Sequence, residues 1–397
     1  MLAQEKYWTL IIPFAIAIII LAILRVDYLL ALVAFLSPLS ITLSELGIYS
    51  PIGVEMSLPT EPLLFGLMII AWVKMFSDSN LFRGLYSHPI SWCIAIYIFW
   101  MFFTSMSSSI PMVSLKVLVT RLWFISSFYV LAYSWFQQRE KIHVFVSCYL
   151  FGLSIVAIYT LIQHALLGFD HDAAHWVMSP FYKDHTSYGM SLAMFIPFAF
   201  YLYGWGETFN KKLVYGFCLL LILFAIIFSY TRAAWLSLIA AAFIFIVMKL
   251  KIRFFVLFGS GILLFSFLFV FQTELLMALE KNSQDSSDSF TEHIESISNV
   301  TTDASNLERI NRWKSAIRLF KERPHLGWGL GTFQFNYASY QNYYDKTIIS
   351  TNSGNKGNAH SEYLSILAET GWPGLFIFIV FLVVVFSKSI VLYGNLE

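Results

Sequence analysis

Charged residues are scarce in this chain, and their scarcity excludes an ordinary soluble protein. Only 12% of its 397 residues are Asp, Glu, Lys or Arg, while 58% are hydrophobic. A typical soluble domain carries about 25% charged residues. The formal net charge is +1, so no overall positive field favours nucleic acid as a partner. The composition therefore indicates an integral membrane protein.

Cysteine is also scarce, which limits the redox and metal chemistry open to the chain. The three cysteines, Cys93, Cys148 and Cys218, all fall in apolar segments, so no disulfide framework or cysteine-based metal site is readable. No HExxH or similarly spaced ligand pair surrounds His360. We therefore expect neither a metal nor a cofactor. One alternative stays open, a cation held by the polar residues of a single connector: His171, His175, His185, Asp170, Asp172 and Asp184.

Long apolar runs fill most of the chain and predict an all-α, polytopic transmembrane helical bundle of about 11–12 spans. A helix needs about 17–25 apolar residues to cross the bilayer, and an open strand could not satisfy its backbone in lipid. We expect the first run to be a retained span rather than a cleaved signal peptide. The candidate spans lie at about 8–24, 28–43, 62–77, 89–106, 115–134, 142–167, 188–205, 212–229, 233–248, 252–272 and 372–393.

The spacing of these runs predicts three regions. Residues 1–272 form a transmembrane bundle of about ten spans, 273–361 form one large polar loop with amphipathic helices, and 362–397 form a final span. Basic connectors, such as the one with Arg139 and Lys141, alternate with acidic or histidine-rich ones. The positive-inside rule places the basic connectors in the cytoplasm. The large loop then faces outward.

The large loop contains a strongly basic amphipathic helix, predicted over about 303–323. Its apolar residues recur at steps of three and four, which is the helical period. They are Leu307, Ile310, Trp313, Ile317 and Phe320. Two interpretations stay open. The helix rests on anionic headgroups, or Arg309 faces inward and binds an anion through its planar guanidinium.

Four other polar residues have positions that suggest function. Arg232 lies at the outer edge of a span, where it either has a functional partner or extends to the interface. Lys116 and Arg121 lie within the span 115–134 and could extend an anion site into the bilayer. His360 lies where the large loop re-enters the membrane, and it is either a catalyst or a hydrogen-bonded structural residue.

Three motifs in order resemble those of the O-antigen ligase family and its lipopolysaccharide polymerase relatives. His360 and Ser361 are followed, after nine residues, by Gly-x-x-Gly at 371–374. The Thr-Arg-Ala-Ala-Trp run at 231–235 is similar to the family's Ser-Arg-Gly/Ala segment. Arg309-x-x-x-Trp313, followed by the segment 324–329, is similar to its Arg-x-x-x-Trp…Pro-x-x-Gly-x-Gly run. The chain departs from the family in having one span after the loop, where two or three are usual.

The resemblance implies a multi-pass glycosyltransferase of the bacterial inner membrane, with its active site facing the periplasm. Such enzymes take a glycan from undecaprenyl diphosphate; ligases pass it to lipid A–core, and polymerases pass it to another lipid-linked glycan. By position, Arg232 and Arg309 would bind the diphosphate, and His360 would act at the acceptor hydroxyl, as a base or by orienting it. Substrate-binding roles are expected for Arg121, Lys116, Arg312, Trp313 and Ser361.

The ligase is the favoured reading because of the His-Ser-x9-Gly-x-x-Gly match, and the polymerase is the nearest alternative. We expect single displacement with inversion and no metal, since cationic side chains can stabilise the departing diphosphate. A transporter of lipid-linked glycans and a non-catalytic scaffold are the alternatives from other classes. The transporter is disfavoured because the sequence has no internal repeat with paired broken helices.

Overall fold

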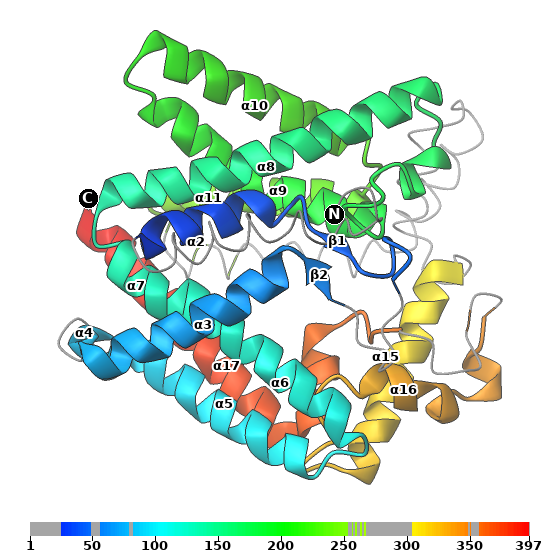
Figure 1. Cartoon of the computed structure of the whole chain (residues 1–397). Helices are drawn as coiled ribbons and strands as arrows, with labels where there is room; N and C mark the ends of the chain where they lie inside the picture. Colours follow the sequence, from blue (N-terminus) through cyan, green and yellow to red (C-terminus); the bar gives the residue numbers. More distant parts are fainter. Residues whose placement is uncertain are drawn as a thin grey trace, which may run out of the picture. The chain divides into compact units, whose positions relative to one another are not determined.

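Helices make up nearly all of the described structure. The computed structural model describes residues 25–48, 56–78, 82–252, 304–347, 350 and 357–396, together with the isolated residues 256, 259, 263 and 266. Strand structure in these residues is limited to a short antiparallel ladder, in which β1 (Ile41–Thr42) pairs with β2 (Ser57–Leu58). The all-α fold class is therefore confirmed (Figure 1).

The long helices follow the apolar runs of the sequence. Among the residues that the structure describes, seven helices are long and apolar enough to cross a membrane, so the chain is a multi-pass membrane protein. They include the predicted spans 62–77, 89–106, 115–134, 142–167, 212–229, 233–248 and 372–393. In the structure these are α3 (Thr60–Ser77), α5 (Pro89–Met106), the continuous segment Pro111–Trp135, α8 (Arg139–Leu166), α10 (Phe209–Ile227), α11 (Arg232–Lys249) and α17 (Glu362–Leu396).

Two predicted spans differ from the structure. The span 28–43 is wrong, because α2 (Val26–Leu36) has 11 residues and ends before Pro38, and β1 follows. The span 188–205 is a helix, α9 (His185–Trp205), but its many polar residues leave it outside the seven apolar candidates. The predicted spans 8–24 and 252–272 lie almost wholly outside the described residues. The predicted division into three regions stays a prediction.

The chain forms two compact units. The first comprises Met1–Trp72 and Leu131–Leu275, and the second comprises Val73–Val130 and Leu276–Glu397. In the first unit, α8, α9 and α10 enclose a core that includes Leu150, Leu192 and Ile222, each fully buried. Gly152 lets α2 pack against α8, because a β-carbon there would collide with the backbone of Phe35.

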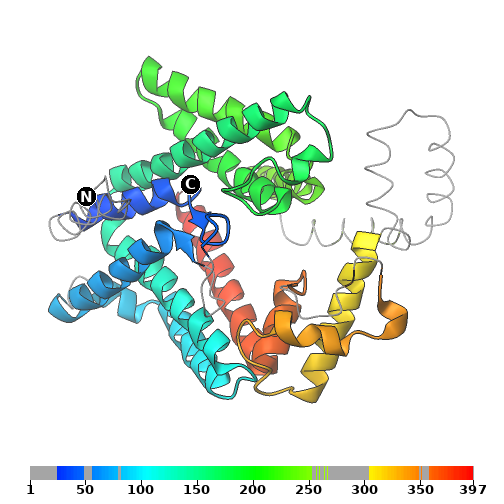
Figure 2. The same cartoon turned by 45° about the vertical axis from the view of Figure 1, so that its right-hand side comes forward.

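The second unit is built around the first half of α17. Helix α5 runs alongside α17 in both views (Figure 2), and Trp100 on α5 donates a hydrogen bond from Nε1 to the Thr370 carbonyl at 2.9 Å. The remaining elements of this unit include α4 (Arg83–Ser87), α6 (Pro111–Ile125), most of the π-helical turn Ser126–Leu131, α15 (Ala304–Glu322), α16 (Phe333–Asn336) and the 3-10 turns η5 (Tyr337–Tyr340) and η6 (Tyr343–Asp345). This unit contains most of the predicted site residues.

Candidate functional site

Helix α15 confirms the predicted basic helix but turns a different face inward. Its fully buried side chains include Glu308, Asn311 and Ser315, at 3%, 0% and 0% exposure. The predicted apolar stripe is only partly covered, and Trp313 and Ile317 are each 40% exposed. A buried face of polar groups is stable only when those groups are hydrogen-bonded. The first part of the inward face of α15 is therefore a hydrogen-bonding face, and Ala316 and Leu319 continue it as an apolar one.

Glu308 is the centre of that hydrogen-bonding face. Its Oε1 accepts from Nε of Arg312 at 2.9 Å, and its Oε2 accepts from the hydroxyls of Thr347, at 3.2 Å, and Ser350. Asn311 donates to the same Oε2 at 3.3 Å. Burial raises the pKa of the Glu308 carboxyl, but the hydrogen bonds from Ser350, Arg312 and Asn311 outweigh burial and leave the pKa below its ordinary value. Glu308 is therefore an ionised carboxylate at neutral pH.

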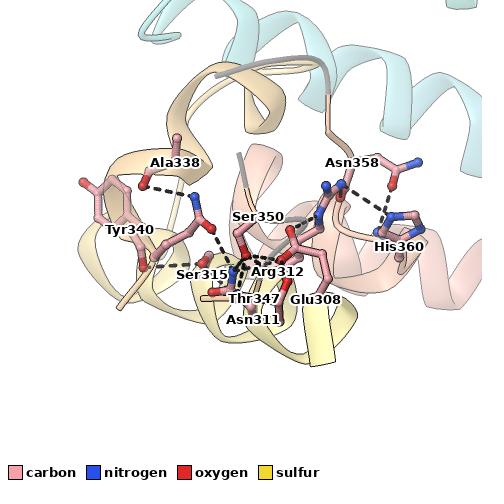
Figure 3. A network of polar contacts seen from close by, with 11 residues as sticks. Glu308, Asn311, Arg312, Ser315, Ala338, Tyr340, Thr347, Ser350, Asn358 and His360 are labelled. Carbon is pink, nitrogen blue, oxygen red and sulfur yellow. Dashed lines mark hydrogen bonds and ion pairs between the residues drawn. The ribbon is translucent and has the colours of Figure 1, made fainter. Parts of the chain in front are cut away.

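Arg312 connects this carboxylate to His360 (Figure 3). Its Nη1 donates to the Asn358 carbonyl at 3.0 Å and lies 3.4 Å from Nε2 of His360. The guanidinium also lies over the ring of Tyr337, 5.3 Å from the ring centroid. Since a guanidinium only donates, its hydrogen bond to the imidazole requires a lone pair on Nε2 of His360. The geometry therefore places an unprotonated Nε2 at the guanidinium.

The chain before α17 is shaped to hold His360 against Arg312. His360 has a φ of 48°, which is rare for a non-glycine residue, and its backbone N–H donates to Oδ1 of Asn358 at 3.1 Å. A β-carbon at position 357 would lie 2.6 Å from Nη1 of Arg312, so Gly357 lets the chain pass this close. Ser361 then accepts from the backbone N–H of Leu364 at 3.4 Å, as a helix cap does. Its predicted role in substrate binding stays a prediction.

The Gly-x-x-Gly motif forms a break inside α17. Gly371 has a φ of 71°, and a β-carbon there would collide with the His325 carbonyl. The backbone N–H of Trp372 donates to the Pro324 carbonyl at 3.0 Å. Gly374 lies against Thr370, again with no room for a β-carbon. These contacts join the segment after α15 to α17, so the two glycines serve the architecture of the site.

Glu369 holds the glycine-rich segment 327–331 and was missed by sequence reasoning. Its carboxylate accepts from the backbone N–H groups of Gly331, at 2.9 Å, and Phe333, at 3.1 Å. Its own carbonyl accepts from Gly329 at 2.8 Å. The visible signal in the sequence is an acidic residue two positions before the Gly-x-x-Gly motif, where the last apolar run begins. Glu308 was also missed, although its spacing of four from Arg312 is that of a helical ion pair.

The other predicted cations of this unit lie outside the Arg312–His360 contact. Arg309 is exposed on the side of α15 that carries Trp313, so the inward orientation considered for Arg309 is wrong for this unit. Lys116 is half-buried on α6 and Arg121 is exposed there. Arg121 interacts electrostatically with Glu369. Anion binding by these three residues stays a prediction.

Arg232 belongs to the first unit, where it is the first residue of α11. The preceding turn is fixed from both sides. Thr231 donates from its hydroxyl to the His185 carbonyl at 2.8 Å, and Gly189 leaves just enough room for the Thr231 side chain. Tyr230 adopts a φ of 47°. These contacts therefore fix the backbone that carries Arg232.

Three histidines of the histidine-rich connector, His171, His175 and His185, lie close together in the same unit. The Nδ1 atoms of His175 and His185 are 3.0 Å apart, and the ring centroids of His171 and His175 are 5.9 Å apart. Within the residues that the structure describes, no group of three His, Cys, Asp or Glu side chains could hold a metal ion. The considered cation site at this connector is therefore not formed.

The fold and the site together define a multi-pass membrane protein with a polar, arginine- and histidine-bearing segment between its apolar helices. Residues 217–379 match the family model described as O-Antigen ligase. The match confirms the resemblance to the O-antigen ligase and polymerase family over this part of the chain. Comparisons with curated proteins and with solved structures each gave no significant match. The family implies glycosyltransferase-like ligase or polymerase activity on lipid-linked glycans in general.

Proposed function

We propose that the chain is an O-antigen ligase-type glycosyltransferase of the bacterial inner membrane. It transfers a glycan from undecaprenyl diphosphate to a hydroxyl of lipid A–core on the periplasmic side, without a metal and with inversion. The observation that carries the proposal is the contact between Arg312 and His360 inside the segment that matches the family. A guanidinium beside an imidazole nitrogen that carries a lone pair suits an anionic leaving group and a hydroxyl nucleophile.

The arginines act on the donor. The bond between the anomeric carbon and the diphosphate oxygen breaks, and negative charge grows on the departing undecaprenyl diphosphate. Arg309 and Arg312 bind its oxygens, because the planar guanidinium fork matches phosphate geometry. For Arg232 the same kind of role is proposed from its place in the family motif alone. Preorganised cations in a site with little water stabilise this charge strongly, and this contribution is usually the largest one in catalysis. Lys116 and Arg121 extend the cationic path along α6.

His360 acts on the acceptor. The diphosphate of the donor takes over the hydrogen bond that Arg312 makes to His360, which frees the lone pair of Nε2. The acceptor oxygen then attacks the anomeric carbon as the leaving group departs, and its proton passes to Nε2 of His360. The ordinary pKa of an imidazole, about 6.5, suits this transfer at neutral pH. The contact with Arg312 at 3.4 Å supports the role, since it places Nε2 beside the cationic group that binds the donor. Asn358 and Gly357 fix the direction of the ring.

The test is complementation of a host that lacks its own O-antigen ligase. We expect the wild-type chain to restore a ladder of glycans on lipid A–core, and His360→Ala, Arg232→Ala and Arg312→Ala to abolish it. Lys321→Ala is the matched control, because Lys321 is an exposed cation at the far end of α15. Its ladder should equal that of the wild type.

Other outcomes of this test identify the alternatives. Long glycans that accumulate on undecaprenyl diphosphate, unattached to core, would show a polymerase. A wild type that restores no glycan product at all, in the presence of donor, would contradict both enzymes and favour a transporter or scaffold. Variants that behave like the wild type would show that the arginines and His360 are structural.

A further inference from the structure

Two neighbouring tyrosines are displayed on the extramembrane part of the second unit. Tyr343 is 82% exposed and Tyr344 is 89% exposed, whereas the next most exposed apolar side chain in the described part of 304–361 is Phe335, at 42%. Their rings meet edge to face, with centroids 5.7 Å apart. Large exposed aromatic surfaces outside a bilayer commonly mark binding sites.

The turn that carries these rings is held from its C-terminal side by an ion-pair cluster. Asp345 accepts from Nζ of Lys314 and from Nη2 of Arg318, each at 2.6 Å. These charged partners hold the pKa of the Asp345 carboxyl below its ordinary value. The cluster therefore stays ionised at neutral pH and fixes one end of η6 to α15.

The other end of the turn is fixed to the same helix. Nη1 of Arg318 donates to the Tyr340 carbonyl at 2.8 Å, and Nδ2 of Asn311 donates to Oε1 of Gln341 at 2.7 Å. The rings of Tyr343 and Tyr344 thus project from a backbone that is anchored on both sides. A preorganised surface loses little conformational freedom on binding, and tyrosine supplies rigid, amphipathic contact area.

We propose that Tyr343 and Tyr344 form a glycan-binding platform, on which sugar rings of the substrate stack. A pyranose presents a face of C–H groups and a rim of hydroxyls, which suits a tyrosine ring with its polar O–H. The exposed side chain of Asn342, beside the rings, offers hydrogen bonds to hydroxyls. The inference rests on the proposed function, because the family match supplies the glycan as substrate class.

The composition of the turn favours a glycan over the bilayer surface. A segment that lies in the membrane interface combines aromatic residues with aliphatic ones on a broad apolar face. In the segment 341–347, the two tyrosines are flanked only by Gln, Asn, Asp, Lys and Thr. The glycan has two sources with the same chemistry, the lipid-linked donor and the core acceptor. The platform serves one of them by holding sugars beyond the reacting ring.

The experiment measures binding by the full chain in nanodiscs of zwitterionic lipid, without turnover. One probe is the glycan released by mild acid from the host's lipid-linked donor, and the other is the deacylated core oligosaccharide. We compare the wild type with the double variants Tyr343→Ala/Tyr344→Ala and Tyr343→Phe/Tyr344→Phe. Phe335→Ala is the matched control, an exposed aromatic residue of α16.

We expect the double alanine variant to weaken binding of one probe by about tenfold or more, the usual cost of losing an aromatic anchor. The double phenylalanine variant should lose far less, because the stacking faces remain, and Phe335→Ala should bind like the wild type. The weakened probe identifies the donor or the acceptor as the source. Equal binding of both probes by the wild type and the double alanine variant would overturn the platform.

Two further readouts separate this inference from its alternatives. If fluorotyrosine signals at 343 and 344 are broadened by a spin-labelled lipid headgroup and not shifted by either oligosaccharide, the tyrosines face the bilayer and the platform is wrong. If the wild type transfers no glycan but binds a probe through the tyrosines, the proposed function fails and the platform stands. If the wild type transfers glycan but the double alanine variant binds both probes equally well, the proposed function stands and the platform is wrong.

Discussion

Glu308 accepts a hydrogen bond at 2.9 Å from Nε of Arg312, one helical turn further along α15. The side chains of Glu308 and Arg312 are 4% and 12% exposed, so this ion pair is largely removed from water. Through its Nε bond the carboxylate fixes the plane of the guanidinium and directs Nη1 to Asn358 and His360. The carboxylate therefore orients the arginine that the proposed mechanism uses.

Replacing Glu308 should uncouple Arg312 from His360. Glu308→Ala leaves a buried guanidinium without its anion, which typically costs about 3–5 kcal/mol of stability. Glu308→Gln keeps an acceptor oxygen and should cost less stability, while still lowering transfer because the orientation relaxes. Thermal unfolding and glycan transfer in nanodiscs measure the two effects. Glu322→Gln is the control on the same helix, and wild-type stability of Glu308→Ala would contradict the prediction.

The two arginines of α15 should differ in what their removal does to the fold. Arg309 is exposed, so Arg309→Ala should change stability by no more than about 0.5 kcal/mol. Arg312→Ala should destabilise the protein, because it leaves the buried Glu308 carboxylate without its ion pair. Under the proposed function each should lower transfer by about 10²–10³-fold. Arg312→Lys should not rescue activity, since lysine lacks the planar fork.

The comparison of these two arginines is read from paired measurements of unfolding and activity on the same preparations. Loss of transfer by Arg309→Ala at unchanged stability would support a direct role in anion binding. If both substitutions destabilised the protein equally, the orientation of α15, with Arg309 exposed and Arg312 turned inward, would be wrong.

Substituting the helix break should damage the architecture of the second unit. Gly371→Ala forces a β-carbon into a φ of 71° and against the His325 carbonyl. Strain of this kind costs about 1–3 kcal/mol before the collision is counted. We expect lower thermal stability and loss of transfer together. Gly66→Ala is the control, because a β-carbon there meets nothing within 4 Å, and equal effects of the two would refute this explanation.

Much of the fold could be predicted from the sequence because it depends on local pattern. Apolar runs long enough to cross a bilayer gave the spans, and a three- and four-residue period gave α15 to within two residues of its observed bounds, Ala304–Glu322. The span 28–43 failed because its apolar run includes Pro38, which ends α2 early. Local pattern therefore predicts where helices lie and, less reliably, where they end.

The candidate site could be predicted only in part, because its contacts join distant positions. The first part of the inward face of α15 is polar, and Asn311 finds its partner in Gln341, thirty positions later. No periodicity reveals that pairing, so the sequence predicts only that the helix rests on anionic headgroups or turns Arg309 inward. His360 was found through a motif, whereas the partner that fixes it, Arg312, was ranked below Arg309. Pairing of buried polar groups is tertiary information.

Chelation should leave the activity unchanged if arginines alone stabilise the departing diphosphate. Transfer by the purified chain in nanodiscs is measured before and after treatment with EDTA, and again after Mg²⁺ is added. We expect the same rate in all three conditions, because fixed cationic side chains supply the charge that a metal supplies elsewhere. Activity that disappears with EDTA and returns with Mg²⁺ would refute the metal-independent mechanism.

Acidification should protonate Asp345 and so loosen the attachment of the turn η6 to α15. Its pKa lies below the ordinary value of 3.8 because Lys314 and Arg318 donate to the carboxylate. A lowered pKa contributes stability that is fully present above the ordinary value and is lost as the pH falls through the folded-state value. Hydrogen exchange of the segment 340–347 should therefore be steady, after correction for intrinsic rates, from pH 8 to about pH 5 and increase below about pH 4.

Asp345→Asn should exchange faster at neutral pH and show little of this acid dependence, because the ion pairs are already absent. If the wild type and Asp345→Asn respond alike to acid, the ion pairs with Lys314 and Arg318 do not hold the turn.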